Sequence, residues 1–313
     1  MNFRFGFFIY ILFLFSCSSK YDNSNLKIFK YNESNGISTL DPVFAKDKAT
    51  IWATSQVFNS LVKMGDNLKV QPCVASSWTI SEDGLLYTFY VREDVFFHDN
   101  ENFTEGKGRR VVASDFVYSF DRLLSEDLAA PGSWVFNNVS SYSAINDTTL
   151  QIYLKQSFPP FLSLLSMQYC SVVPFECAEK EEFRSNPVGT GPFQFQYWKE
   201  GVKLVLRKNN NYFEQENGVK LPYLDAVSIT FIKDKQSEFL SFLQGDLDFI
   251  SGIDPSYKDE ILNRDGTLKE KYSEKINLES LPFLNTEYLG FLLDGTSETS
   301  ENIYLRKAIN SAI

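Results

Sequence analysis

The sequence predicts an α/β protein that carries a separate, smaller α+β unit. Strand-like and helix-like segments alternate in the second half of the chain, which favours a sheet covered by helices. An earlier stretch is rich in hairpin patterns and favours an antiparallel unit of its own. The length of 313 residues leaves room for two domains.

The composition is that of a globular protein and argues against nucleic-acid binding. Hydrophobic residues make up 43% of the chain and charged residues 22%, which is typical of a folded domain. The chain has 30 Lys and Arg against 40 Asp and Glu, so it lacks the positive charge on which phosphate binding depends. The single histidine, His98, argues against a histidine dyad and against histidine-rich metal sites.

The first 25 residues have the pattern of an export signal followed by a tether. Arg4 precedes the apolar run Phe5–Phe15, which is too short to cross a bilayer core of about 30 Å. Ser16-Cys17 then looks like a bacterial lipobox, in which Cys17 carries the lipid. We expect a signal peptide at 1–16 and a lipidated tether at 17–25. A signal anchor or ordinary cleavage nearby is the alternative.

Three further cysteines follow, at positions 73, 170 and 177. An odd number outside the cytoplasm leaves at least one unpaired. Cys170 and Cys177 could form a disulfide if the residues between them fold back, and burial as small hydrophobic side chains is the alternative.

Residues 26–64 predict a strand, a turn and a helix in that order. Leu26–Tyr31 alternates like a strand, and Pro42 ends the extended run because proline has no N–H to donate. Apolar residues recur at near-helical spacing within Thr50–Met64.

Residues 78–167 predict the antiparallel unit. Trp78–Ser81 and Tyr87–Arg92 flank Asp83-Gly84, a strong hairpin signal. Ser114 is the expected N-cap of a helix with Phe116, Val117, Phe120, Leu123 and Leu124 on one face. Thr149–Leu154 predicts another strand, and Phe161–Met167 predicts a short helix.

From residue 189 onward the pattern becomes α/β. Gly189-Thr190-Gly191-Pro192 predicts a tight turn, and strands are expected in Val202–Lys208, Tyr223–Ile232 and Leu247–Ile250. Between the last two strands, Asp234 and Gly245 would cap a helix that turns Phe239, Leu240, Phe242 and Leu243 inward. An apolar stripe at Leu305, Ala308, Ile309, Ala312 and Ile313 ends the sequence without a cap, and we expect that the chain is truncated there.

None of the motifs that could carry catalysis has the required pattern. Gly189-Thr190-Gly191 lacks the spacing of either nucleotide-binding loop. His98 and Asp99 would point to opposite faces of a strand, so a hydrogen-bonded structural histidine is expected. The pairs Asp246/Asp248 and Asp225/Asp234 are better explained as surface or capping residues than as the acid and base of a glycosidase.

Several motifs in order resemble one family, the substrate-binding proteins of peptide ABC transporters (oligopeptide/dipeptide type, solute-binding family 5). The matching segments are Ser38–Pro42, Val57–Val62, Gln71–Trp78, Ser81–Gly84, Tyr87–Phe89, Val91–Asp99, Val112–Phe120, Gly189–Phe193, Pro222–Asp225, Leu243–Asp248 and Leu305–Ile309. The resemblance covers the chain from about residue 26 to its end.

The resemblance implies a periplasmic-binding-protein fold in which a small α+β subdomain interrupts one lobe. Mapped onto this sequence, the first lobe comprises 26–58 and 180–284, the inserted subdomain 59–179, and the second large lobe begins at 285–313 with most of it missing. The carboxylate that grips the peptide α-ammonium in the family lies in the missing part.

The resemblance also implies where a ligand binds. The loop Ala45–Ala49, and within it Ala45, Lys46, Asp47 and Lys48, corresponds to a cleft-lining loop. Phe283 and Tyr288 stand where aromatic side chains flank the peptide, although interlobe packing explains them equally well.

The expected function is therefore capture, not catalysis. A lipid-anchored, extracytoplasmic monomer would bind peptides between two lobes and deliver them to an ABC permease, with no cofactor, metal or catalytic residue. The alternatives are the same fold with an oligosaccharide, a metal chelate or another solute, a secreted hydrolase with an aromatic cleft, or a surface lipoprotein that serves adhesion.

Overall fold

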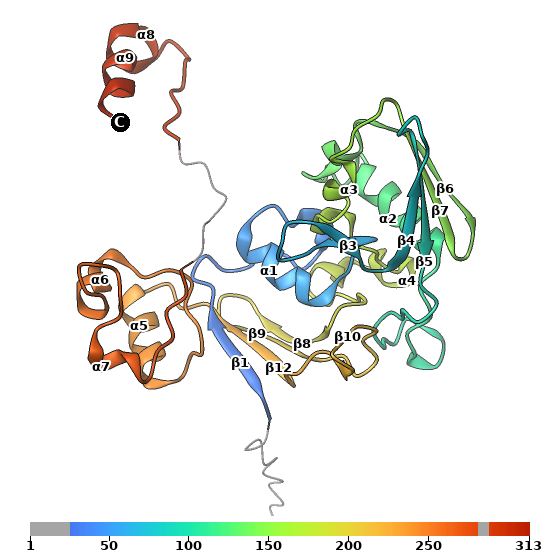
Figure 1. The fold of residues 1–313 in the computed structure, drawn as a ribbon, viewed down its shortest axis with the longest axis horizontal. Coiled ribbons are helices and arrows are strands. Elements are labelled where there is room, and N and C mark those ends of the chain that lie inside the picture. The colour runs from blue at the N-terminus through green and yellow to red at the C-terminus, as the bar shows by residue number, and fades with distance from the viewer. Residues whose placement is uncertain (1–25, 281–287) are drawn as a thin grey trace, which may run out of the picture. The chain divides into compact units, whose positions relative to one another are not determined.

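The computed structural model describes residues 26–280 and 288–313 (Figure 1). The predicted signal peptide, the tether with Cys17, and Phe283 lie outside the described residues. The chain divides into two compact units, one that ends at Gly252 and one that comprises Ile253–Ile313. Among the helices of the described residues, none has the length and apolar character needed to cross a bilayer.

The first sheet unites strands from both ends of the first unit. Its strand order is β1 (Ile28–Asn32), β12 (Ala226–Thr230), β9 (Lys203–Lys208) and β8 (Phe193–Lys199). β1 pairs with β12 in parallel, and the other neighbours are antiparallel. The side chain of Asp225 accepts a hydrogen bond from the Lys27 N–H at 2.8 Å, which ties the start of β1 to a residue 198 positions later.

The second sheet is antiparallel throughout. It has the order β4 (Ala75–Ile80), β5 (Leu86–Val91), β7 (Thr149–Leu154) and β6 (Val139–Asn146). The hairpin expected around Asp83-Gly84 and the strand expected at Thr149–Leu154 are both confirmed. Helix α2 (Ala113–Leu124) packs against β6 and β7.

Shorter elements complete the first unit. They are the helices α1 (Lys48–Val57), α3 (Phe161–Leu164), α4 (Phe175–Ala178) and α5 (Lys235–Gln244), and the hairpins β2 (Val62–Met64) with β3 (Val70–Pro72) and β10 (Gln215–Glu216) with β11 (Val219–Lys220). The 3-10 turns η2 to η6 lie at Pro42–Phe44, Thr104–Gly106, Ser133–Phe136, Gln168–Cys170 and Glu181–Arg184.

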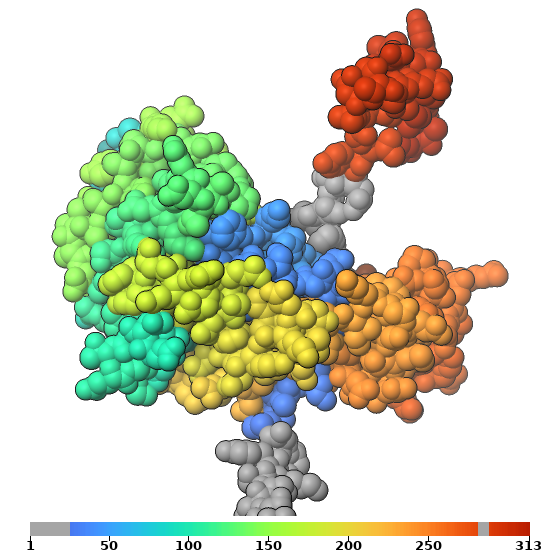
Figure 2. All heavy atoms as spheres, turned by 180° about the vertical axis from the view of Figure 1, so that it is seen from behind, coloured from blue at the N-terminus to red at the C-terminus, as the bar shows by residue number. Residues whose placement is uncertain are grey.

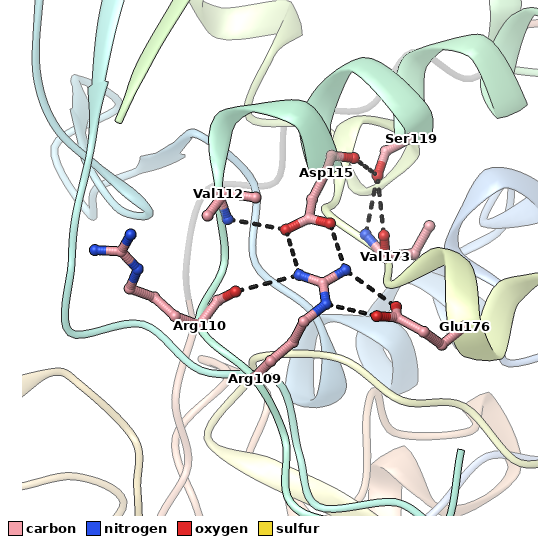
Figure 3. A network of polar contacts seen from close by, with 7 residues as sticks. All are labelled: Arg109, Arg110, Val112, Asp115, Ser119, Val173 and Glu176. Atoms are coloured by element: carbon pink, nitrogen blue, oxygen red, sulfur yellow. Dashed lines mark hydrogen bonds and ion pairs between the residues drawn. The ribbon is translucent and has the colours of Figure 1, made fainter. Parts of the chain in front are cut away.

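Helix α2 begins earlier than the sequence suggested. We expected Ser114 as the N-cap, but Val112 takes that position, and the Asp115 carboxylate accepts the Val112 N–H at 2.8 Å. The same carboxylate receives two N–H groups from Arg109 at 2.7 and 2.8 Å (Figure 3). Arg109 therefore fixes the first turn of α2, and the start of the helix depends on a residue outside it.

Three other expectations need correction. Helix α1 ends at Val57, and strand β2 begins at Val62, so Thr50–Met64 is not one helix. Leu247–Ile250 makes one bridge, between Phe249 and Tyr31, and is not a strand. In α5 the caps Asp234 and Gly245 are confirmed, but Leu240 and Leu243 are exposed and of the apolar side chains only Phe239 is buried.

One hydrophobic cluster extends through both sheets of the first unit. Fully buried side chains come from α1 (Val57), from β5 (Phe89), from α2 (Phe116 and Phe120) and from β9 (Leu204). Figure 2 shows the blue residues near α1 between the green segment that contains α2 and the yellow strands. Cys73, Cys170 and Cys177 are buried and unpaired, which supports the alternative to a disulfide.

The second unit consists of short helices in its described residues. These are α6 (Pro255–Ile261), α7 (Glu270–Ser273), α8 (Glu298–Glu301) and α9 (Ile303–Ala312). The helix expected at the end of the chain is present, and Asn302 caps it by accepting the N–H groups of Tyr304 and Leu305. No residue of α9 is buried.

Candidate functional site

The predicted ligand loop directly follows the 3-10 turn Pro42–Phe44, which lies between β1 and α1 in the chain. The Asp41 carboxylate accepts the Val43 N–H at 3.3 Å and so caps the 3-10 turn Pro42–Phe44. The Ala45 N–H then donates to the Pro42 carbonyl at 3.1 Å, and the Lys46 N–H donates to the Phe44 carbonyl at 2.8 Å. Ala45 is 1% exposed, whereas Lys46, Asp47 and Lys48 are exposed. The loop is therefore internally bonded and presents three charged side chains.

Asp47 and Lys48 have roles in starting helix α1. The Asp47 carboxylate accepts the Thr50 N–H at 2.9 Å and the Thr50 hydroxyl at 3.1 Å, which is the usual work of an N-cap residue. The Lys48 ammonium donates to the Ser251 hydroxyl at 3.2 Å and lies 4.8 Å from the centre of the Trp52 ring. Among the described residues, the Lys46 ammonium has neither a hydrogen bond nor an ion pair.

A hollow of about 430 Å³ lies beside this loop. It is lined by Asn35–Ser38, which follow β1, and by Asp47, Lys48 and Ala49 at the start of α1. Beyond the carboxyl end of a strand that has a parallel neighbour is the usual place for a ligand in an open α/β sheet. The loop and the hollow together are the candidate site.

A second hollow, of about 360 Å³, is lined largely by aromatic side chains. Phe29 and Tyr31 of β1, Trp52 of α1 and Phe249 line it, with neighbouring ring centres 6.0–6.4 Å apart. The sequence analysis missed this group. The alternating pattern of the strand places Phe29 and Tyr31 on one face, and this was a signal for an aromatic surface. No sequence pattern near Phe249 indicates that it packs beside them.

The other expected site residues are Cys17, Phe283 and Tyr288. Cys17 and Phe283 fall outside the described residues. Tyr288 is 87% exposed and belongs to the second unit. A cleft role for Phe283 and Tyr288 stays a prediction.

His98 has the structural role expected for it. It is buried, and the Gly189 N–H points at its Nδ1 at 3.4 Å, so Nε2 carries the proton and donates to the Gly191 carbonyl at 2.9 Å. Burial lowers the pKa of His98 to about 4, so the ring is neutral. Asp99 accepts from Lys107 and from the Gly108 N–H instead. There is no His98–Asp99 dyad.

The glycine turn and the carboxylate pairs also act structurally. A Cβ on Gly189 would lie 2.1 Å from the Val57 carbonyl oxygen, so glycine is required there for close packing. Asp225 and Asp248 each accept a backbone N–H from the β1 segment, and Asp234 caps α5. In the described ranges, 26–280 and 288–313, no group of three His, Cys, Asp or Glu residues is placed to hold a metal ion.

This fold and this sequence define a class of protein. The chain belongs to the bacterial extracellular solute-binding proteins, family 5, whose middle-region model matches residues 69–313. The members of this family bind solutes and are not enzymes. The mixed α/β fold is that of the periplasmic binding proteins, as expected from the sequence.

Two curated relatives and one solved structure illustrate the family. The dipeptide-binding protein of Escherichia coli K12 is 27% identical over 82% of this chain and 48% of its own length. Heme-binding protein A of Haemophilus influenzae is 28% identical over 83% and 48%. The periplasmic binding protein DppA from Helicobacter pylori, in complex with the peptide STSA, superposes with a TM-score of 0.68 at 27% identity over 75% of this chain and 48% of that one.

The chain spans about half the length of the curated relatives it matches. The two curated relatives are also named for different solutes, heme and dipeptides. The family is therefore shown, and the solute of this chain is a separate question.

Proposed function

We propose that this protein binds peptides and delivers them to an ABC permease, and that the loop Ala45–Lys48 is part of the peptide site. The observation that carries the proposal is a hollow after the end of β1 that Asp47 and Lys48 line, with the exposed Lys46 next to them in the chain. Relatedness to a dipeptide-binding protein and to a structure solved with a peptide supports the choice of ligand.

The peptide would lie extended along the loop and pair with main-chain groups, as in the addition of a strand to a sheet. Lys46 is the side chain best suited to contact it, because its ammonium has no partner among the described residues, whereas the Asp47 carboxylate already caps α1. A positive charge at this position would attract the peptide C-terminal carboxylate or an acidic side chain.

A metal chelate is the less favoured solute. The one histidine of the chain is buried, and both of its ring nitrogens face main-chain groups of the glycine turn. It could bind a metal only if that turn opened. Uncharged solutes would leave the exposed charges of the ligand loop without a partner.

The division of the chain into lobes and its attachment to the membrane belong to the same proposal. The first lobe would comprise 26–58 and 180–284, the inserted subdomain 59–179, and a second lobe would begin at 285. Closure of two lobes over the peptide would create the form that a permease recognises. Lipid on Cys17 would keep the protein at the membrane surface, outside the cytoplasm.

The experiment uses the protein as its bacterium makes it, extracted with detergent. Calorimetric titration with di- to pentapeptides is expected to give saturable binding, and native mass spectrometry is expected to recover the peptide unchanged. The variant Lys46→Glu should weaken the binding of acidic peptides by about tenfold or more, because an attraction becomes a repulsion.

Lys69→Glu is the matched control, because Lys69 is an equally exposed lysine on the turn between β2 and β3. Lys69→Glu changes the net charge by the same amount as Lys46→Glu and leaves the loop Ala45–Lys48 unaltered. If the unaltered protein binds none of these peptides, the peptide proposal is wrong. If both variants lose affinity equally, the loop is not the site.

A further inference from the structure

A buried ion pair joins the turn before the ligand loop to helix α2. The Arg122 guanidinium donates to both oxygens of the Asp41 carboxylate, at 2.8 and 2.5 Å. The side chains of Arg122 and Asp41 are 10% and 4% exposed. The two residues are 81 positions apart in the sequence.

Neighbouring groups hold this pair in one geometry. The Arg122 guanidinium lies 5.4 Å from the centre of the Phe183 ring, which limits its movement on one side. The Leu40 N–H donates to the Arg184 carbonyl at 2.8 Å, which anchors the main chain just before Asp41. Three segments of the first unit therefore meet at the Asp41 carboxylate.

A short series of hydrogen bonds runs from Asp41 to Lys46. The carboxylate oxygen that accepts from Arg122 Nη1 also accepts the Val43 N–H. The Phe44 N–H donates to the Asp41 carbonyl at 3.2 Å, and the N–H groups of Ala45 and Lys46 donate to the carbonyls of Pro42 and Phe44. A shift of Asp41 would therefore move the main chain that carries Lys46.

We propose that Arg122 is a positioning residue for the ligand loop and acts through Asp41. It does not contact the ligand. Its fork of N–H groups holds the carboxylate in the orientation that caps the turn, and the turn fixes Lys46. The part of this inference that concerns affinity rests on the proposed peptide site, and the part that concerns loop order does not.

Arg122→Lys tests the proposal, with Arg109→Lys as the matched control. Both changes keep the positive charge and remove a bidentate fork on a carboxylate that is 4% exposed. Arg109 binds Asp115 and Glu176, which have no bond to the ligand loop (Figure 3). Hydrogen–deuterium exchange of the amides of residues 43–46 is the first readout, and peptide affinity is the second.

In Arg122→Lys, the amides of residues 43–46 should exchange about tenfold faster, and peptide affinity should fall by about the same factor, as expected for the loss of one hydrogen bond to a charged group. Arg109→Lys should speed exchange near Val112 and leave both loop exchange and affinity unchanged. Equal loop exchange in the two variants would overturn the proposal, and so would unchanged peptide affinity in Arg122→Lys.

Asp41→Asn keeps the test decisive if Arg122→Lys does not fold. Asparagine has the same size and still accepts the Val43 N–H, but it loses the charge that holds Arg122. Exchange at residues 43–46 should again rise and should lie between the values for the unaltered protein and Arg122→Lys. If the unaltered protein binds no peptide, the proposed function fails, and the exchange data still decide the role of Arg122.

Discussion

Arg109 and Arg110 are adjacent in the chain and almost equally exposed, yet their removal should have very different effects on stability. The Arg109 side chain is 31% exposed and that of Arg110 is 32% exposed. The partners of Arg109 are Asp115, 4% exposed, and Glu176, 19% exposed. The partners of Arg110 are Glu93 and Asp147, 73% and 75% exposed. Figure 3 shows the Arg110 guanidinium pointing away from the network that Arg109 builds.

The magnitude follows from the burial of the partners. Arg109→Ala leaves the Asp115 carboxylate with the Val112 N–H and without a cation, and breaking a buried pair from one side costs about 3–5 kcal/mol. Water can reach Glu176 and the space left by Arg109, so we expect the lower end, about 3 kcal/mol. Arg110→Ala removes exposed pairs and should cost less than about 1 kcal/mol.

Urea unfolding of the two variants and the unaltered protein measures this difference. The free energy of unfolding, extrapolated to water, should fall in Arg109→Ala by about 2 kcal/mol more than in Arg110→Ala. A double variant Arg109→Leu/Asp115→Leu should recover part of the loss, because the most deeply buried carboxylate is removed together with its cation. Equal losses in Arg109→Ala and Arg110→Ala would refute the argument that partner burial sets the cost.

Three further outcomes are expected. The pKa of His98 is about 4 in the folded protein and 6.5 ordinarily, so the unfolded state binds more protons between these two pH values. The free energy of unfolding should therefore fall by about 2–3 kcal/mol from pH 7.5 to 4.5. Urea titrations at the two pH values measure this fall, and His98→Gln should remove it. Gly189→Ala should abolish soluble expression, since its Cβ would meet the Val57 carbonyl oxygen. In the control Gly201→Ala the Cβ has open space, so only the strain of the positive φ should lower the free energy of unfolding, by about 1–2 kcal/mol. Cys17→Ser should move the protein from the detergent phase to the aqueous phase in phase partitioning, and no change in partitioning would count against the lipid anchor.

The sequence predicted best where the signal is local. The hairpin around Asp83-Gly84 depends on a turn and its flanking strands, and both lie within 20 residues. The buried face of α2 depends on spacing alone, and Phe116, Phe120 and Leu123 are buried as expected. Leu124 follows the same pattern but is 41% exposed.

Prediction failed where a distant group decides. In α5 the apolar residues predicted a wide inward face, but Leu240 and Leu243 are exposed, and the buried polar contact is instead Glu238, which accepts from Asn32 at 2.8 Å. Ser114 is a good N-cap by composition, yet α2 starts one residue before it, because Arg109 holds Asp115 at the third helical position. Asn32 lies 206 positions from Glu238, and Arg109, although only six positions from Asp115, lies outside the helix whose pattern was used.

The candidate site shows the same division between local and distant causes. Resemblance predicted the loop Ala45–Lys48 as part of the site, whereas the helix was expected within Thr50–Met64 and the capping role of Asp47 was not foreseen. No spacing rule links Asp41 to Arg122, although each stands at the edge of a matching segment, Ser38–Pro42 and Val112–Phe120. Arg122 lies two residues beyond the helix motif, where the sequence shows only a charged residue on an amphipathic helix. Because the two form a desolvated pair, the motif containing Asp41 and the helix containing Arg122 are one structural unit, and under the proposed role of Arg122 the shape of the loop Ala45–Lys48 depends on both.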